Sequence, residues 1–123
     1  MPELKLKQLQ YESATWKRSL GYIIEENIHL KNRLSAILKD KFAKNLLDQL
    51  ENFQSSFLKE DERISLLRND IVEFDKLLEI SQIGKLQKEI TGKLKKIRNN
   101  ITSTETQFGN LKIEFNGYVS ENI

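Results

Sequence analysis

The sequence predicts an all-α protein in which three long helices form an antiparallel, up-down-up coiled-coil bundle. Two observations carry this prediction. Apolar residues recur with alternating spacings of three and four along most of the chain, which is the pattern of a heptad repeat. The chain also contains one proline and five glycines, too few turn-forming residues for a sheet joined by many tight turns. Its 123 residues suit a single helical domain spanning residues 1–123.

We expect the first helix at about residues 4–39. Its apolar seam keeps the alternating spacing without a slip, and one seam position is an amide, Asn27. Ile24 and Leu38 widen the apolar stripe, so this helix is expected to contact more than one neighbour. The predicted seam consists of Leu6, Leu9, Ser13, Trp16, Leu20, Ile23, Asn27, Leu30, Leu34 and Ile37.

The second helix is expected at about residues 41–80, after a change of phase. Its seam starts at Ala43, with Asp40 as the N-cap. Glu60 falls on this seam inside the charged segment 59–63. A solvated patch or a break capped by Asp61 would explain that segment, but we expect one helix because the register continues across it. The predicted seam consists of Ala43, Leu46, Leu50, Phe53, Phe57, Glu60, Ile64, Leu67, Ile71, Phe74 and Leu78.

The third helix is expected at about residues 84–116, after a turn supplied by Ser81 and Gly84. Two successive steps of four at its start form a stutter in the heptad pattern. Asn116-Gly117 is expected to end the helix, and the residues beyond are expected to fray. The predicted seam consists of Leu86, Ile90, Leu94, Ile97, Ile101, Thr104, Phe108, Leu111 and Phe115.

The charges agree with a folded-back bundle. Residues 1–39 carry seven Lys/Arg and four Asp/Glu (+3), residues 40–80 carry six and ten (−4), and residues 81–123 carry seven and four (+3). An acidic helix between two basic helices avoids like-charged neighbours. The net charge of +2 is too small to indicate a nucleic-acid partner by itself.

Several classes of site and location are disfavoured by composition. The chain has no cysteine, which excludes disulfides and thiolate chemistry. The N-terminus lacks the apolar core of a signal peptide, and no stretch approaches the roughly 20 apolar residues of a membrane span, so a cytoplasmic location is expected. Neither a catalytic residue, a metal site nor a cofactor is predicted. The acidic residues either splay around a helix, as in Glu60-Asp61-Glu62, or lack an accompanying histidine, as in Asp75 and Glu79.

These features predict a non-enzymatic protein–protein interaction or assembly module that self-associates through the first helix or binds another helical protein. Asn27 is the candidate that sets the register, because a buried amide disfavours other pairings; the alternative is a hydrated asparagine at the edge of the seam. Trp16 is a candidate anchor for a partner, although its seam position favours the core. The remaining candidates are apolar flank positions that would dock a helix, namely Ile24, Ile28, Leu38 and Leu47.

A second functional hypothesis comes from the segment "IHLKNRLSAI" (residues 28–37). It resembles the phosphoacceptor boxes of sensor histidine kinases (His, an acidic residue, then Leu-Lys-Asn-Pro-Leu) and of histidine phosphotransfer domains (His-x-Leu-Lys-Gly). The resemblance implies a phosphorelay bundle with His29 as the phosphoacceptor. Aligning the Leu-Lys-Asn run at 30–32 puts Ile28 at the phosphorylated position, however, and Arg33 replaces the proline of the kinases. His29 itself is expected to face solvent.

A third hypothesis is nucleic-acid binding through the basic segment 85–98, which has no interleaved aromatic residue for base stacking. The cations of this segment are Lys85, Lys88, Lys93, Lys95, Lys96 and Arg98. Separately, the stretches "KEDERISLLRND" and "EFNGYVSEN" resemble those of short uncharacterised bacterial coiled-coil and helical-bundle proteins. That resemblance implies a bacterial, non-secreted setting and no particular activity.

Overall fold

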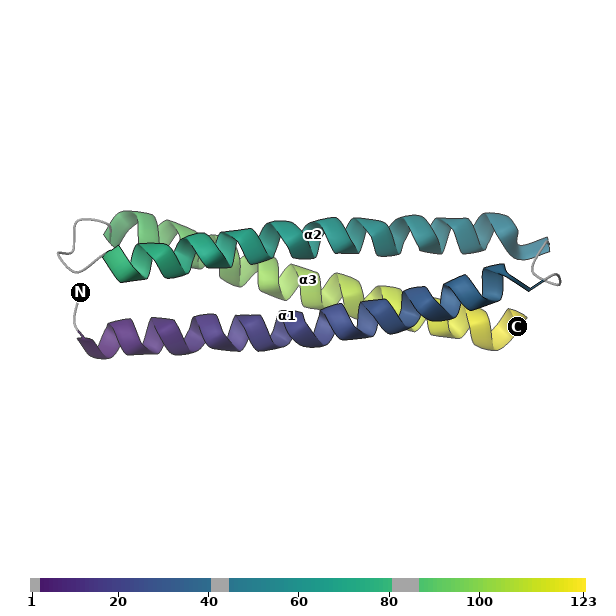
Figure 1. The fold of residues 1–123 in the computed structure, drawn as a ribbon, viewed down its shortest axis with the longest axis horizontal. Coiled ribbons are helices and arrows are strands. Elements are labelled where there is room, and N and C mark those ends of the chain that lie inside the picture. Colours follow the sequence, from purple (N-terminus) through teal and green to yellow (C-terminus); the bar gives the residue numbers. More distant parts are fainter. Residues whose placement is uncertain (1–2, 41–44, 81–86) are drawn as a thin grey trace.

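The computed structural model describes residues 3–40, 45–80 and 87–123, and within these residues the chain forms three α-helices. They are α1 (Glu3–Leu38), α2 (Leu47–Ile80) and α3 (Gln87–Asn122). The helices run up, down and up along one another, as Figure 1 shows. The predicted all-α three-helix bundle is therefore confirmed.

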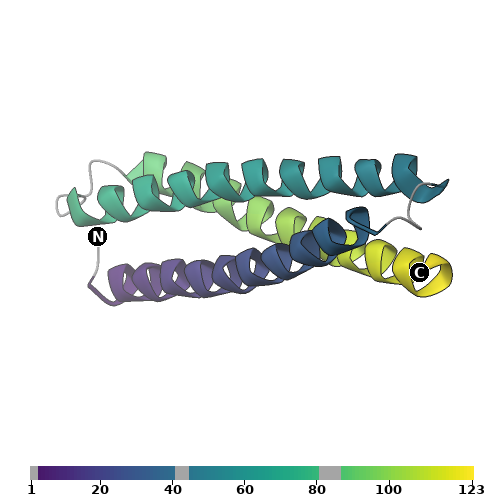
Figure 2. The same cartoon turned by 45° about the vertical axis from the view of Figure 1, so that its right-hand side comes forward.

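α2 is the central helix of the bundle. It packs along both α1 and α3, whereas α1 and α3 meet each other more sparsely. Figure 2 shows the reason: α3 runs diagonally, starting beside the end of α2 and finishing near the end of α1. A hydrogen bond of 3.1 Å from Arg33 Nη1 to Asn116 Oδ1 joins α1 and α3 at that end.

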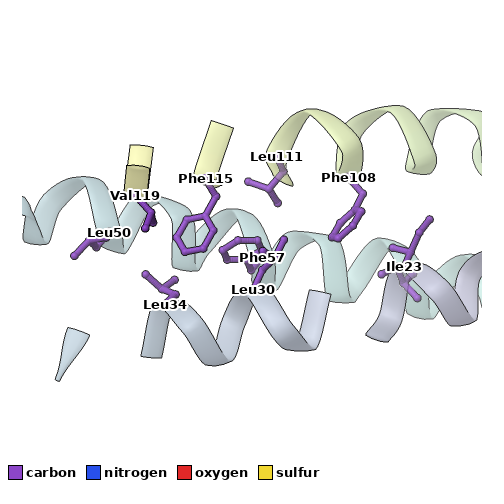
Figure 3. Packing of buried hydrophobic residues seen from close by; sticks show 10 residues of the cluster. Ile23, Leu30, Leu34, Leu50, Phe57, Phe108, Leu111, Phe115 and Val119 are labelled. Atoms are coloured by element: carbon purple, nitrogen blue, oxygen red, sulfur yellow. The ribbon is translucent and has the colours of Figure 1, made fainter. Parts of the chain in front are cut away.

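The predicted seams form the core. Within the described residues every seam position is buried or half-buried, as the alternating spacing requires when three apolar stripes face one axis. The core consists of two clusters, one at each end of the bundle. In the cluster of Figure 3, the rings of Phe57 and Phe115 meet edge to face at 5.2 Å. In the other cluster, Trp16 packs against Phe74 with ring centroids 5.2 Å apart.

Two features of the helices refine the sequence prediction. α2 is continuous through the charged segment, as expected, but Glu60 is buried with 2% of its surface exposed, so this residue does not belong to a solvated patch. α3 does not end at Asn116-Gly117 but continues to Asn122. Its last turns are held because Val119 is buried in the core cluster and Tyr118 packs against it.

The predicted seam residues Ala43 and Leu86, the predicted turn residues Ser81 and Gly84, and the helix start that Asp40 was expected to cap lie outside the described residues. None of the described helices has an apolar stretch long enough to cross a membrane.

Candidate interaction surface

A groove runs along the outer side of the α1–α2 interface, away from α3. One hollow of this groove has a volume of about 560 Å³. Two further hollows continue it, since one shares Ile24 and Arg68 with the first, and the other shares Lys31 with the second. The groove extends from Lys17 to Leu38 on α1, which corresponds to about 30 Å of helix. Its apolar part lies between Lys17 and Lys31, and the end that reaches Leu38 is lined mainly by polar side chains, including Asn32, Ser35 and Gln54. We call this feature the α1–α2 groove. Its main lining residues are Lys17, Gly21, Ile24, Ile28, Lys31, Asp61, Ser65, Arg68 and Val72.

The groove has an apolar bottom and exposed apolar walls. Core residues Leu20, Ile64 and Ile71 form its floor. On the walls, Ile28 is 46% exposed and Val72 is 49% exposed. These are large apolar side chains that the three helices leave partly in water. The groove is therefore apolar surface of the kind that marks a protein-binding site.

Gly21 keeps the groove open. A Cβ atom at this position would meet no other atom within 4 Å, so the wall is low where a larger side chain would fit. A glycine in a helix interior weakens the helix by roughly 1 kcal/mol relative to alanine. Packing within this chain does not require a glycine at position 21, because a larger side chain would fit there.

Two sets of polar contacts cross the groove at positions two heptads apart. In the first, Asp75 accepts a hydrogen bond from Ser13 Oγ at 2.5 Å and pairs with Lys17 Nζ at 2.5 Å. We call these three residues the outer clamp. Each of the two carboxylate oxygens has its own partner on α1, one buried and one at the surface.

The second set repeats the first. Asp61 Oδ1 accepts a hydrogen bond of 2.6 Å from Asn27 Nδ2, and Asp61 Oδ2 lies 2.8 Å from Lys31 Nζ. We call Asn27, Lys31 and Asp61 the central clamp. In both clamps a buried polar residue of α1 is followed four residues later by a lysine, and both partners contact one aspartate of α2.

The clamps fix the register of α1 against α2. The buried residues Ser13 and Asn27 are fourteen positions apart, and so are the aspartates Asp61 and Asp75. A slip by one heptad would leave both buried polar groups without their acceptors. Such an unsatisfied buried group costs roughly 1–3 kcal/mol. Asn27 is therefore a buried amide bonded across the α1–α2 interface, and its role in setting the register of an assembly stays a prediction.

The clamps also place lysines on the α1 side of the groove and aspartates on its α2 side, where they pair with each other. Lys17 and Lys31 lie along the α1 edge, and Asp61 and Asp75 lie along the α2 edge. Between the two clamps the charges are exchanged: the acidic residue, Glu25, is on α1 and the basic residue, Arg68, is on α2. Each edge is therefore marked by charges at fixed heights.

The predicted interaction residues fall into two groups. Ile24, Ile28 and Leu38 line the α1–α2 groove. Leu47 is 44% exposed but lies at the first turn of α2, outside the set of lining residues. The other two candidates, Trp16 and Asn27, are buried within the bundle.

The basic segment is divided between two faces of α3. Lys93 and Lys96 pair with Glu73 and Asp70 of α2. The hydrogen bond between Lys93 and Glu73 raises the pKa of the lysine and lowers the pKa of the carboxylate. The segment therefore does not present all its charges as one stripe.

The remaining cations of this segment differ in their surroundings. Arg98 reaches Glu12 of α1 through two hydrogen bonds of 2.6 and 2.7 Å, which raise the pKa of the guanidinium. Lys88 and Lys95 are exposed, and Lys85 lies outside the described residues. His29, the residue of the phosphorelay hypothesis, is exposed on α1, as its seam phase predicts.

Four buried polar atoms have no hydrogen-bond partner among the described residues: Asn27 Oδ1, Glu60 Oε1, Thr104 Oγ1 and Tyr118 Oη. Glu60 Oε2 pairs with Arg63 of its own helix at 2.7 Å. Burial raises the pKa of Glu60, the charge of Arg63 opposes that rise, and neighbouring Asp61 adds to it. Glu60 is therefore a desolvated carboxylate with an incomplete set of partners.

In the described parts of the chain, no three histidine or carboxylate side chains come close enough together to hold a metal ion. The clamp aspartates and Ser13 were missed as functional candidates. The signal that could have identified them is the shared spacing: lysines at 17 and 31 and aspartates at 61 and 75 repeat with the same interval.

No protein-family model, no curated protein and no solved structure matches this chain, so its geometry and charge carry the functional argument.

Proposed function

We propose that this protein is a non-enzymatic coiled-coil assembly module and that it self-associates through the α1–α2 groove. The observation that carries the proposal is the apolar part of the groove, with Ile24, Ile28 and Val72 on its walls and charged clamps across it. Burying such side chains against a second helical surface is favourable by about 25 cal/mol per Å². The mechanism is helix-in-groove recognition.

The occupant is a second copy of this chain. A partner for this groove must present apolar side chains together with charges that suit Glu25 and Arg68, since the clamp lysines and aspartates already pair within the chain. The α1–α2 face of a second copy offers both, because it has the same apolar walls and carries an arginine for Glu25 and a glutamate for Arg68. A face about 30 Å long and about two helices wide offers on the order of 600 Å² per chain, near the lower end of stable interfaces.

The opposite side of α2 is a poorer candidate. The hollow between α2 and α3 is lined mostly by polar side chains, including Arg63, Asp70, Asn100 and Gln107. Burying such a surface requires a partner for each polar group, whereas the apolar part of the α1–α2 groove also offers the exposed side chains of Ile28 and Val72. Self-association is therefore expected on the α1 side of α2.

The experiment uses a pair of exposed isoleucines. Ile28→Glu places a carboxylate on the groove wall, and Ile113→Glu makes the same change on α3, where Ile113 is 72% exposed. Both changes leave the single chain folded because both side chains already face water. Light scattering across a concentration series should give a dimer for the original chain and for Ile113→Glu, and a monomer for Ile28→Glu.

Circular dichroism provides the control, since all three proteins should be equally helical. A monomer at every concentration of the original chain would contradict the proposal. So would a dimer that persists in Ile28→Glu. The cytoplasmic and bacterial setting expected from the sequence belongs to the same proposal, and it is compatible with a small assembly module.

A further inference from the structure

We infer that the two copies meet about a two-fold axis parallel to the α1–α2 groove, so that α1 of each copy lies against α2 of the other. This inference rests on the proposed self-association and specifies its geometry. The result is a central antiparallel four-helix bundle made of two α1 and two α2 helices. The two α3 helices lie on its outer sides, because α3 packs on the face opposite the groove.

The orientation of the clamp ion pairs selects this axis: lysine and aspartate already pair within each chain, and each pair then meets an oppositely oriented pair of the other copy. A two-fold axis parallel to the groove turns the edge with Lys17 and Lys31 onto the partner's edge with Asp61 and Asp75, at unchanged heights. A two-fold axis perpendicular to the helices would instead place α1 of one copy on α1 of the other, and α2 on α2. Lysines would then face lysines and aspartates would face aspartates, an arrangement that is penalised when the groups are partly buried.

The charges inside the groove agree with the same axis. Glu25 and Arg68 line the groove on opposite helices. When α1 lies against the partner's α2, Glu25 of one copy approaches Arg68 of the other, and the symmetry repeats that pair. With the perpendicular axis, the glutamates would approach each other, and so would the arginines. Every charged group that lines the groove between the clamps therefore favours the parallel axis.

The uncharged residues permit close approach. Gly21 on α1 and Ser65 on α2 are small and line the groove beside Ile24. Free space surrounds the Cβ position of Gly21. Small residues at these heights let the helix of the second copy settle between the isoleucines, as ridges fit into grooves in packed helices.

Single cysteines test the arrangement, because the chain contains none of its own. Ile24→Cys marks α1, Ser65→Cys marks α2, and both positions line the same stretch of the groove. One variant is labelled with ¹⁵N, the two are mixed under reducing conditions, and a short bifunctional thiol reagent is then added. Mass spectrometry distinguishes cross-links between unlike chains from cross-links between like chains.

The expected result is a cross-link mainly between unlike chains, because Ile24→Cys then lies beside Ser65→Cys of the other copy. Each variant alone should cross-link several-fold less, since the like helices lie on the diagonal of the four-helix bundle. Light scattering of the same reduced samples must show dimers.

A dimer that cross-links mainly like with like, or not at all, would overturn the inferred axis while leaving self-association intact. The absence of any dimer would overturn the proposed function as well. The two failures are therefore distinguishable.

Discussion

The two sides of α2 differ in whether buried polar groups find a hydrogen-bond partner on the neighbouring helix. On the side of α1, Asp61 and Asp75 receive hydrogen bonds from the buried residues Asn27 and Ser13. On the side of α3, the charged contacts are lysines at the surface, such as Lys93 with Glu73. Thr104 Oγ1 of α3 is buried without a partner among the described residues.

Glu60 resembles the polar groups on the α3 side of α2. Its ion-pair partner, Arg63, lines the hollow between α2 and α3, and its other carboxylate oxygen is buried without a partner in the described part of the chain. A buried polar group stabilises one pairing only when a partner on the neighbouring helix satisfies it. Buried polarity therefore sets the register between α1 and α2, whereas between α2 and α3 it mainly lowers stability.

The largest effect is expected from Asp61→Ala. This change removes the acceptor of Asn27 Nδ2 in a place where Asn27 is 1% exposed, and it also removes the partner of Lys31. We expect a loss of about 2–3 kcal/mol in the free energy of unfolding, measured by urea denaturation, because a buried donor is left unsatisfied.

The matched control is Glu73→Ala, which removes the ion pair between a carboxylate and Lys93 on the α3 side of the same helix. Glu73 is at the surface, so its loss should have a much smaller effect, and one that added salt reduces further. Equal losses from the two variants would refute the difference between the two sides of α2.

The opposite sign is expected for Glu60→Gln. The amide keeps the shape of the side chain and removes a desolvated charge, so at neutral pH the variant should be more stable by about 1–2 kcal/mol. Glu62→Gln is the control, because Glu62 is exposed two residues further along α2. Thermal or urea unfolding measures both changes.

The gain should also depend on pH. Burial raises the pKa of Glu60 in the folded chain above its usual 4.5, so between those two values the folded state binds more protons than the unfolded state. The contribution of Glu60 to stability is therefore present at low pH and decreases as the pH rises through this window. The difference between Glu60→Gln and the original chain should shrink toward acid pH, and a difference that grows there would contradict the assignment.

The sequence predicted the features that depend on local periodicity. The seams, the continuity of α2 and the burial of Asn27 follow from the positions of apolar residues within each helix. The partners of Asn27 and Ser13 did not follow, because identifying Asp61 and Asp75 requires the register between two antiparallel helices. That register is a property of the pair, and no single helix carries it.

Glu60 and the end of α3 illustrate two further limits. The seam phase placed Glu60 inside, but its charged neighbours suggested solvent; packing on both sides of α2 decided the outcome. Asn116-Gly117 is a common helix ending. Here tertiary contacts of Tyr118 and Val119 extend the helix past it. The groove was foreseen only as scattered flank residues, because its depth depends on how closely α1 and α2 approach.

The smallest change in stability is expected from Asn27→Ile, and it separates stability from register on the α1 side. Isoleucine loses one hydrogen bond to Asp61 but buries apolar surface, and it removes the unsatisfied Asn27 Oδ1. Asp61 keeps Lys31 as its partner and remains partly in contact with water. We therefore expect a gain of about 1 kcal/mol in thermal unfolding, together with a mixture of oligomers in native mass spectrometry, because the central clamp no longer penalises other pairings. Asn110→Ile, at an exposed position of α3, controls for the effect of isoleucine itself. A marked loss of stability in Asn27→Ile alone would mean that the amide stabilises the fold as well as setting the register. The two sides of α2 would then differ in how much their buried polar groups stabilise the chain, and not only in how they select one pairing.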